Sequence, residues 1–128
     1  MGNMYSETDT VLTKSDKRFL VALLASEEAS VAELKSEFDA WSVKTEEIQE
    51  ILVGLVKDGT IGVTNLINEK FNDFTQDESL ALADNWSEFV TLPYQLFLTD
   101  LGYKHWDEDD WGITSRRAKF LIFSNKGN

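Results

Sequence analysis

The chain has 128 residues, of which 42% are hydrophobic and 27% charged, and it contains no cysteine. This is the composition of a folded globular domain, and it excludes disulfides, thiolate catalysis and cysteine-based zinc sites. The net charge of −11 opposes binding to the phosphate backbone of nucleic acids or to an anionic membrane, and it favours a basic protein partner.

A first helix is predicted over residues 15–25. Thr13 is followed three residues later by Asp16, which is typical of a capping box, and Ser15 is the alternative cap. Residues 19–25 are apolar almost all round, a pattern that fits a buried strand as well as a buried helix. The cap and the charged start favour the helix.

Two further helices are predicted after the first. The second, over residues 31–41, follows a capping box formed by Ser30 and Glu33. The third begins with Thr45 as its N-cap and ends before Gly59, a residue suited to a left-handed helix end. Its buried face is predicted from apolar residues at helical spacing, namely Ile48, Ile51, Leu52, Leu55 and Val56.

A small antiparallel sheet is predicted beyond the third helix. Residues 60–63 begin one strand, residues 94–98 follow the only proline and form its partner, and residues 120–123 form a C-terminal strand. Between the first two strands lies a predicted insertion over residues 68–90. An extra helix over residues 76–89 is expected there, with a long hairpin or a loop as alternatives.

The three helices, the Asp-Gly stop and the strand resemble a winged helix-turn-helix domain over residues 15–66, together with residues 94–106. The run TDLGYKHW over residues 99–106 is similar to the segment that closes many such regulators. The fold class expected from this resemblance is α+β and winged-helix-like, with three N-terminal helices, a small antiparallel sheet, an expanded wing and a C-terminal strand. Residues 1–12 are expected to form a polar arm, and residues 13–128 a single domain.

The resemblance implies that the third helix would read DNA, but its exposed face is acidic. That face is predicted to carry Glu46, Glu50, Val53 and Lys57, with Glu47 to one side. A helix that reads base edges needs Arg, Lys, Asn or Gln, and glutamates repel the duplex. Nucleic-acid binding is therefore not expected, unless a dimer uses another surface whose cations are Arg116, Arg117 and Lys119 with Lys14, Lys17 and Arg18.

The second candidate site is an acidic run between two tryptophans. Trp106 and Trp111 flank Asp107, Glu108, Asp109 and Asp110. Four consecutive acids do not converge on one cation, and the spacing of a calcium-binding loop is missing. The run is either a solvated loop or an acidic surface for a basic partner, and the two tryptophans are either anchors for that partner or core residues.

No catalytic pattern is present in the sequence. His105 is the only histidine, without the further ligands of a zinc site or an adjacent nucleophile, and the seven glycines form no phosphate-binding loop. We therefore expect no enzymatic activity, no metal and no cofactor. With no apolar run long enough to cross a bilayer, we also expect no membrane association and a cytoplasmic location.

The charge, the small size and the lack of catalytic residues resemble those of immunity proteins, which neutralise basic nuclease toxins. The resemblance implies a non-catalytic, protein-binding module that acts as a monomer or dimer. The residues expected to bind the partner are Glu46, Glu47, Glu50, Val53, Trp106, Asp107, Glu108, Asp109, Asp110 and Trp111. The alternatives are a dimeric winged-helix transcription regulator and an inhibitor from a phage or mobile element that mimics nucleic acid.

Overall fold

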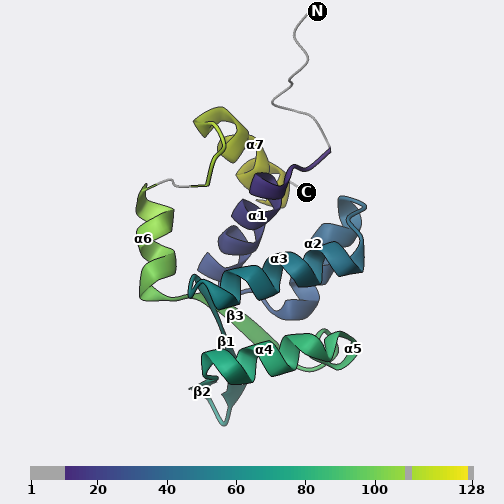
Figure 1. Cartoon of the computed structure of the whole chain (residues 1–128), viewed down its shortest axis with the longest axis vertical. Helices are drawn as coiled ribbons and strands as arrows, with labels where there is room; N and C mark the ends of the chain where they lie inside the picture. The colour runs from purple at the N-terminus through teal and green to yellow at the C-terminus, as the bar shows by residue number, and fades with distance from the viewer. Residues whose placement is uncertain (1–10, 109–110, 127–128) are drawn as a thin grey trace, which may run out of the picture.

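A computed structural model describes residues 11–108 and 111–126 of the chain (Figure 1). Over these residues the fold is α+β, with most of the core residues in the three helices at the start and a small antiparallel sheet after them. The elements are, in chain order, α1 (Lys14–Ser26), α2 (Val31–Ala40), α3 (Thr45–Lys57), β1 (Ile61–Ile67), β2 (Lys70–Asp73), α4 (Gln76–Asp84), α5 (Trp86–Phe89), β3 (Tyr94–Leu98), α6 (Asp100–Glu108) and α7 (Ser115–Lys126).

The capping boxes predicted for α1 and α2 are confirmed. The Thr13 hydroxyl accepts from the backbone N–H of Asp16 at 3.0 Å, and the Ser30 hydroxyl accepts from that of Glu33 at 3.0 Å. The N-cap predicted for α3 is wrong. Thr45 already lies within the helix, and the cap position is held by Lys44, whose side chain cannot accept a hydrogen bond from the backbone.

The sheet has the strand order β2-β1-β3, and all neighbours are antiparallel. The predicted pairing of the 94–98 strand is confirmed, with Leu98 opposite Ile61 and Leu96 opposite Val63. These four side chains are buried beneath α1 and α3 in the core. The outer edge of β3 is closed by the turn between α1 and α2, since the backbone N–H of Leu96 donates to the Ala29 carbonyl at 2.9 Å.

The insertion combines two of the forms expected for it. Its first part is a hairpin, in which Asn68 and Glu69 have φ values of 52° and 66° and form the turn between β1 and β2. Its second part is helical, but the single helix predicted over residues 76–89 is divided. At Asn85 the backbone leaves the helical region, with ψ at 71°, and α5 begins at Trp86.

Helix α4 lies against α3, and two glutamine side chains join them. Gln49 Nε2 donates to the Ala83 carbonyl at 2.8 Å, and Gln76 Nε2 donates to the carbonyls of Val56 and Lys57, each at 2.9 Å. The start of α3 therefore lies beside the end of α4, and the two helices run antiparallel. Figure 1 shows them one below the other across the front of the molecule.

Replacing Gln76 by alanine is expected to lower the free energy of unfolding by about 1 kcal/mol, because the last carbonyls of α3 lose a hydrogen-bond donor. Urea denaturation would measure the change. The matched control is Asp77→Asn, at the next position and exposed. Equal losses from both variants would mean that the glutamine does not hold α4 on α3.

The C-terminal strand predicted over residues 120–123 is wrong, because this segment belongs to α7. The Thr114 hydroxyl accepts from the Arg117 backbone N–H at 3.0 Å and caps the helix. Ala118 and Leu121, three residues apart, are buried, whereas Phe123 is 76% exposed. That periodicity is helical, and it turns one side of α7 toward the core.

A buried ion pair fixes α7 on α1. The Arg117 and Asp16 side chains are each 2% exposed, and Arg117 Nη2 lies 2.9 Å from Asp16 Oδ2. The guanidinium also stands over the Phe120 ring, with its central carbon 5.3 Å from the ring centroid. Nearby, Leu12 is buried, so the chain already packs on the core before α1 begins.

Candidate partner-binding surface

The acids predicted on the third helix lie on the exposed side of α3. Glu46 and Glu50 are exposed, Val53 is half-buried, and the opposite side of the helix enters the core. Their carboxylates are therefore in water, where opposite charges at 4 Å attract by only about 1 kcal/mol. A surface of this kind contributes mainly to the rate and selectivity of an encounter with a cation-bearing partner.

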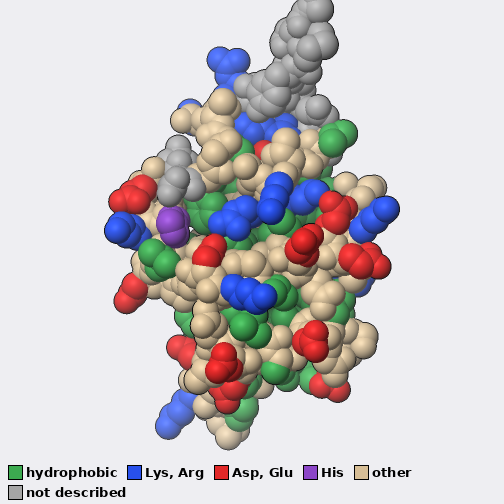
Figure 2. All heavy atoms as spheres, viewed as in Figure 1, with side chains coloured by type: hydrophobic (Ala, Val, Ile, Leu, Met, Phe, Trp, Pro, Cys, Tyr) green, Lys and Arg blue, Asp and Glu red, His purple; other side chains and the backbone are tan. Residues whose placement is uncertain are grey.

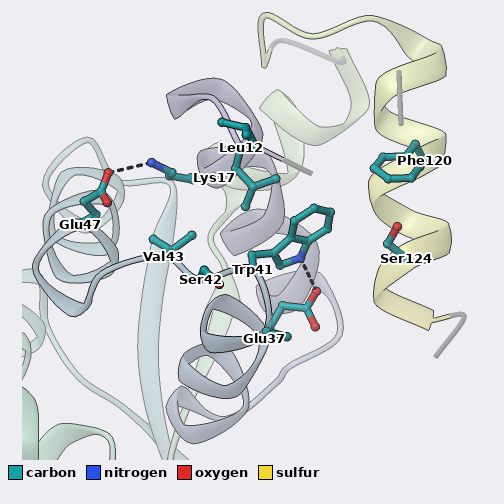
Figure 3. A pocket seen from close by; sticks show the side chains of 11 residues that line it. Leu12, Lys17, Glu37, Trp41, Ser42, Val43, Glu47, Phe120 and Ser124 are labelled. Atoms are coloured by element: carbon teal, nitrogen blue, oxygen red, sulfur yellow. Dashed lines mark hydrogen bonds and ion pairs between the residues drawn. The ribbon is translucent and has the colours of Figure 1, made fainter. Parts of the chain in front are cut away.

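Glu47 already has a partner within the chain. Its carboxylate lies 2.8 Å from the Lys17 ammonium, and the hydrogen bond and charge of that group lower the pKa of Glu47. Figure 3 shows the two side chains pointing toward each other at the rim of a hollow of about 760 Å³ between α2, α3 and α7. A partner would have to compete with Lys17, so Glu47 offers less to it than Glu46 or Glu50.

The two tryptophans of the acidic run pack inside the molecule. Trp106 stacks on Phe19, with ring centroids 5.2 Å apart, and Trp111 meets the same ring edge-on at 6.4 Å. Trp111 is 6% exposed, and Trp106 is half-buried. His105 packs beside Trp111. These rings join α6 and the segment after it to α1, which leaves Trp111 little surface to offer a partner.

The acidic run itself is only partly described by the structure. Asp107 and Glu108 end α6 and are exposed. Asp109 and Asp110 lie outside the described residues. The described pair belongs to the last turn of α6, which Figure 1 shows at the left of the molecule.

Several of the cations that a DNA-binding dimer would need are engaged by acids of this chain. Arg117 is buried against Asp16, Lys17 is paired with Glu47, and Arg18 Nη2 lies 3.3 Å from Asp58 Oδ2. Among the cations proposed for that stripe, Lys14, Arg116 and Lys119 are exposed. Half of the set is therefore already neutralised by acids of this chain.

A third acidic region is brought together by the fold. Residues 71–103 contain no Lys or Arg, and we call them the cation-free segment. The segment runs from β2 through α4, α5 and β3 into α6, and its acids are all exposed: Asp73, Asp77, Glu78, Asp84, Glu88 and Asp100. Figure 2 shows most Lys and Arg side chains in the upper half of this face, with acidic and hydrophobic side chains prevailing around α4.

Acids that are consecutive or that share a helix face do not predict this region, because its acids come from four separate elements. The signal was nevertheless present in the sequence, as the long interval between Lys70 and Lys104 without a cation. In the folded chain β2 and β3 pair with opposite sides of β1, so that Asp73 and Gln95 both lie opposite Thr64.

Within residues 11–108 and 111–126, no cluster of three or more His, Asp or Glu side chains has the geometry to hold a metal ion. None of the helices in the same ranges is long and apolar enough to cross a membrane. Comparison with protein-family models, with curated proteins and with solved structures finds no match to this chain.

Proposed function

We propose that this protein is a non-catalytic, acidic module that binds a basic protein partner, in the manner of an immunity or inhibitor protein. The observation that supports it is the uneven placement of charge. Cations of α1, α2 and α7 pair with acids of the chain itself, in Lys17–Glu47, Arg18–Asp58, Lys35–Asp39 and Arg117–Asp16. Within the part of the chain that the structure describes, Glu46, Glu50 and the acids of the cation-free segment form no ion pair, so the excess negative charge collects there.

The proposal includes a winged-helix-like core. Three helices precede β1, and β1 pairs with β3, which is the order that such a domain requires. In this arrangement α3 takes the place of the DNA-reading helix. Its flank is occupied by α4, and its exposed side carries Glu46 and Glu50.

The same topology favours a second candidate, a transcription regulator that binds DNA as a dimer. Charge opposes it, because each phosphate contact needs an exposed Lys or Arg. An inhibitor that mimics nucleic acid would use the acidic surface proposed above, and the nature of its target distinguishes it: the target would be a nucleic-acid-binding protein.

The test is retention of a partner from a lysate of the source organism by the full chain and by Glu46→Lys/Glu50→Lys. At moderate salt we expect the unchanged protein to retain one basic protein and the charge-reversed variant to lose at least 90% of it, because two repulsive contacts replace two attractive ones at about 1 kcal/mol each. Bound protein and bound nucleic acid would both be identified by mass spectrometry and by staining.

The matched control is Glu28→Lys/Glu69→Lys, which reverses two exposed acids in the α1–α2 turn and in the β1–β2 turn. It changes the net charge equally and is expected to retain the partner. Equal retention by both variants would remove α3 from the proposed surface. Retention of DNA that falls steeply as salt rises would overturn the proposal in favour of the regulator.

A further inference from the structure

A groove of about 340 Å³ lies within the cation-free segment, between α4, α5 and β3. Its apolar lining is aromatic and aliphatic. Tyr94 is central: its ring centroid is 5.7 Å from that of Phe74 and 5.5 Å from that of Phe89. Leu82 adds an aliphatic wall from α4. Phe89 is buried at 1% exposure, while Phe74, Leu82 and Tyr94 are half-buried, so the floor is fixed and the walls are accessible.

Two carboxylates line the same groove. Glu78 comes from α4 and Glu88 from α5, and both are exposed. Glu78 is held in place, because its Oε1 accepts from the Thr75 backbone N–H at 2.8 Å in a capping box. Glu88 has no ion pair or side-chain hydrogen bond to the rest of the described chain. No Lys or Arg is among the described residues that line the groove.

We infer that this groove binds an arginine side chain of the basic partner. The inference rests on the proposed function and adds the chemistry of one contact to it. An arginine has an apolar stem that packs against Leu82 and the aromatic rings, and a planar guanidinium that stacks on such rings and donates to carboxylates. Glu78 and Glu88 supply those acceptors, and no cation of this chain competes for them.

Charge and size decide between arginine and other occupants. The volume is near the lower end of the range for small-molecule sites, which suits one long side chain rather than a helix or a large ligand. An apolar ligand would bury two carboxylates without satisfying them. A lysine would meet the charge, but its compact, strongly hydrated ammonium gains less from the rings than a guanidinium does.

The experiment titrates the full-length protein with three blocked tripeptides of arginine, lysine and citrulline at low salt. Citrulline keeps the shape of arginine without its charge. Methyl NMR would follow Ala81 and Leu82, which line the groove, and Val53, which lies on α3. We expect triarginine to shift the Ala81 and Leu82 methyls in a saturable way, trilysine to bind more weakly and tricitrulline not to bind.

The variant Glu78→Gln/Glu88→Gln removes both carboxylates, and glutamine at position 78 preserves the capping box. It is expected to raise the dissociation constant of triarginine roughly fivefold, the loss of about 1 kcal/mol of ion pairing. The matched control, Glu28→Gln/Glu69→Gln, removes two exposed charges from the α1–α2 turn and the β1–β2 turn. Its dissociation constant is expected to stay within about twofold of the original, since screening weakens distant charges.

Several outcomes would overturn the inference. If triarginine shifts the Val53 methyls and leaves those of Ala81 and Leu82 unchanged, the cation binds on α3. The proposal of a basic partner would then remain, but the groove would have no part in binding it. If trilysine binds as tightly as triarginine, or if both variants raise the dissociation constant of triarginine equally, binding depends on net charge alone and not on the groove. Groove methyls that shift with protein concentration alone would assign the groove to a second copy. If triarginine binds in the groove but no basic protein is retained from the lysate, the proposed function is contradicted and the groove remains an arginine-binding site.

Discussion

Arg117→Met is expected to lower the free energy of unfolding by about 3–5 kcal/mol, the cost of removing one member of a buried ion pair. Methionine replaces most of the arginine stem but leaves the Asp16 carboxylate without its counter-charge at 2% exposure. Arg117 also donates from Nη2 to the Val11 carbonyl at 3.4 Å, and that contact is lost as well. Urea denaturation followed by tryptophan fluorescence measures the change.

Arg116→Met is the matched control, because Arg116 is exposed one position earlier in the same helix. It is expected to change stability by less than about 0.5 kcal/mol. The double variant Asp16→Leu/Arg117→Met should recover part of the loss, since neither charge then remains buried. It cannot recover all of it, because Asp16 also accepts from the Thr13 backbone N–H at 2.9 Å. Equal effects of Arg116→Met and Arg117→Met would contradict the role given to this pair.

Gly102→Ala is expected to destabilise the protein by about 1–3 kcal/mol, through overpacking against the backbone. A Cβ atom at this position would lie 2.2 Å from the Thr60 carbonyl oxygen. Thr99 holds the segment there: its backbone N–H donates to the Thr60 carbonyl at 3.1 Å, and its side-chain oxygen accepts from the Gly102 N–H at 3.1 Å. Helix α6 can make room only by breaking these bonds. Thermal unfolding by circular dichroism would report a lowered midpoint.

Gly54→Ala separates crowding from the general effect of replacing a glycine. Gly54 lies inside α3, and a Cβ atom there would meet no other atom within 4 Å. Alanine is favoured over glycine in a helix by about 0.5–1 kcal/mol, so this variant should unfold at a higher temperature. A Gly102→Ala protein as stable as Gly54→Ala would show that α6 can move away from β1 without loss.

The features predicted correctly from the sequence are those whose causes lie close together in the chain. The capping box of Ser30 and Glu33 spans one helical turn, and α2 begins where it predicts. The strand predicted over residues 120–123 failed for the opposite reason. A short apolar run fits either type of element, and what settles it is burial of Leu121 and Arg117 against α1, far away in the sequence.

The residues of the candidate surface also fall into two groups, those whose position follows from local sequence and those whose position depends on distant contacts. The exposed position of Glu46 and Glu50 follows from the apolar spacing of α3 alone. The packing of Trp106 and Trp111 depends on Phe19, which no local pattern links to them. The aromatic groove also requires the folded chain, because Phe74 and Tyr94 belong to segments separated by two helices and meet only when β2 and β3 have both paired with β1.

The two borders of the sheet differ in what they leave open to other chains. The backbone of β3 is engaged at Leu96 by the Ala29 carbonyl, whereas β2 has β1 on one side only. Edge-to-edge aggregation would therefore have to start along Lys70–Asp73, a strand of four exposed residues. A border this short offers few hydrogen bonds, and a charged side chain at each end disfavours the flat, apolar contact that fibrils require. The short, charged edge thus disfavours templated growth of the sheet.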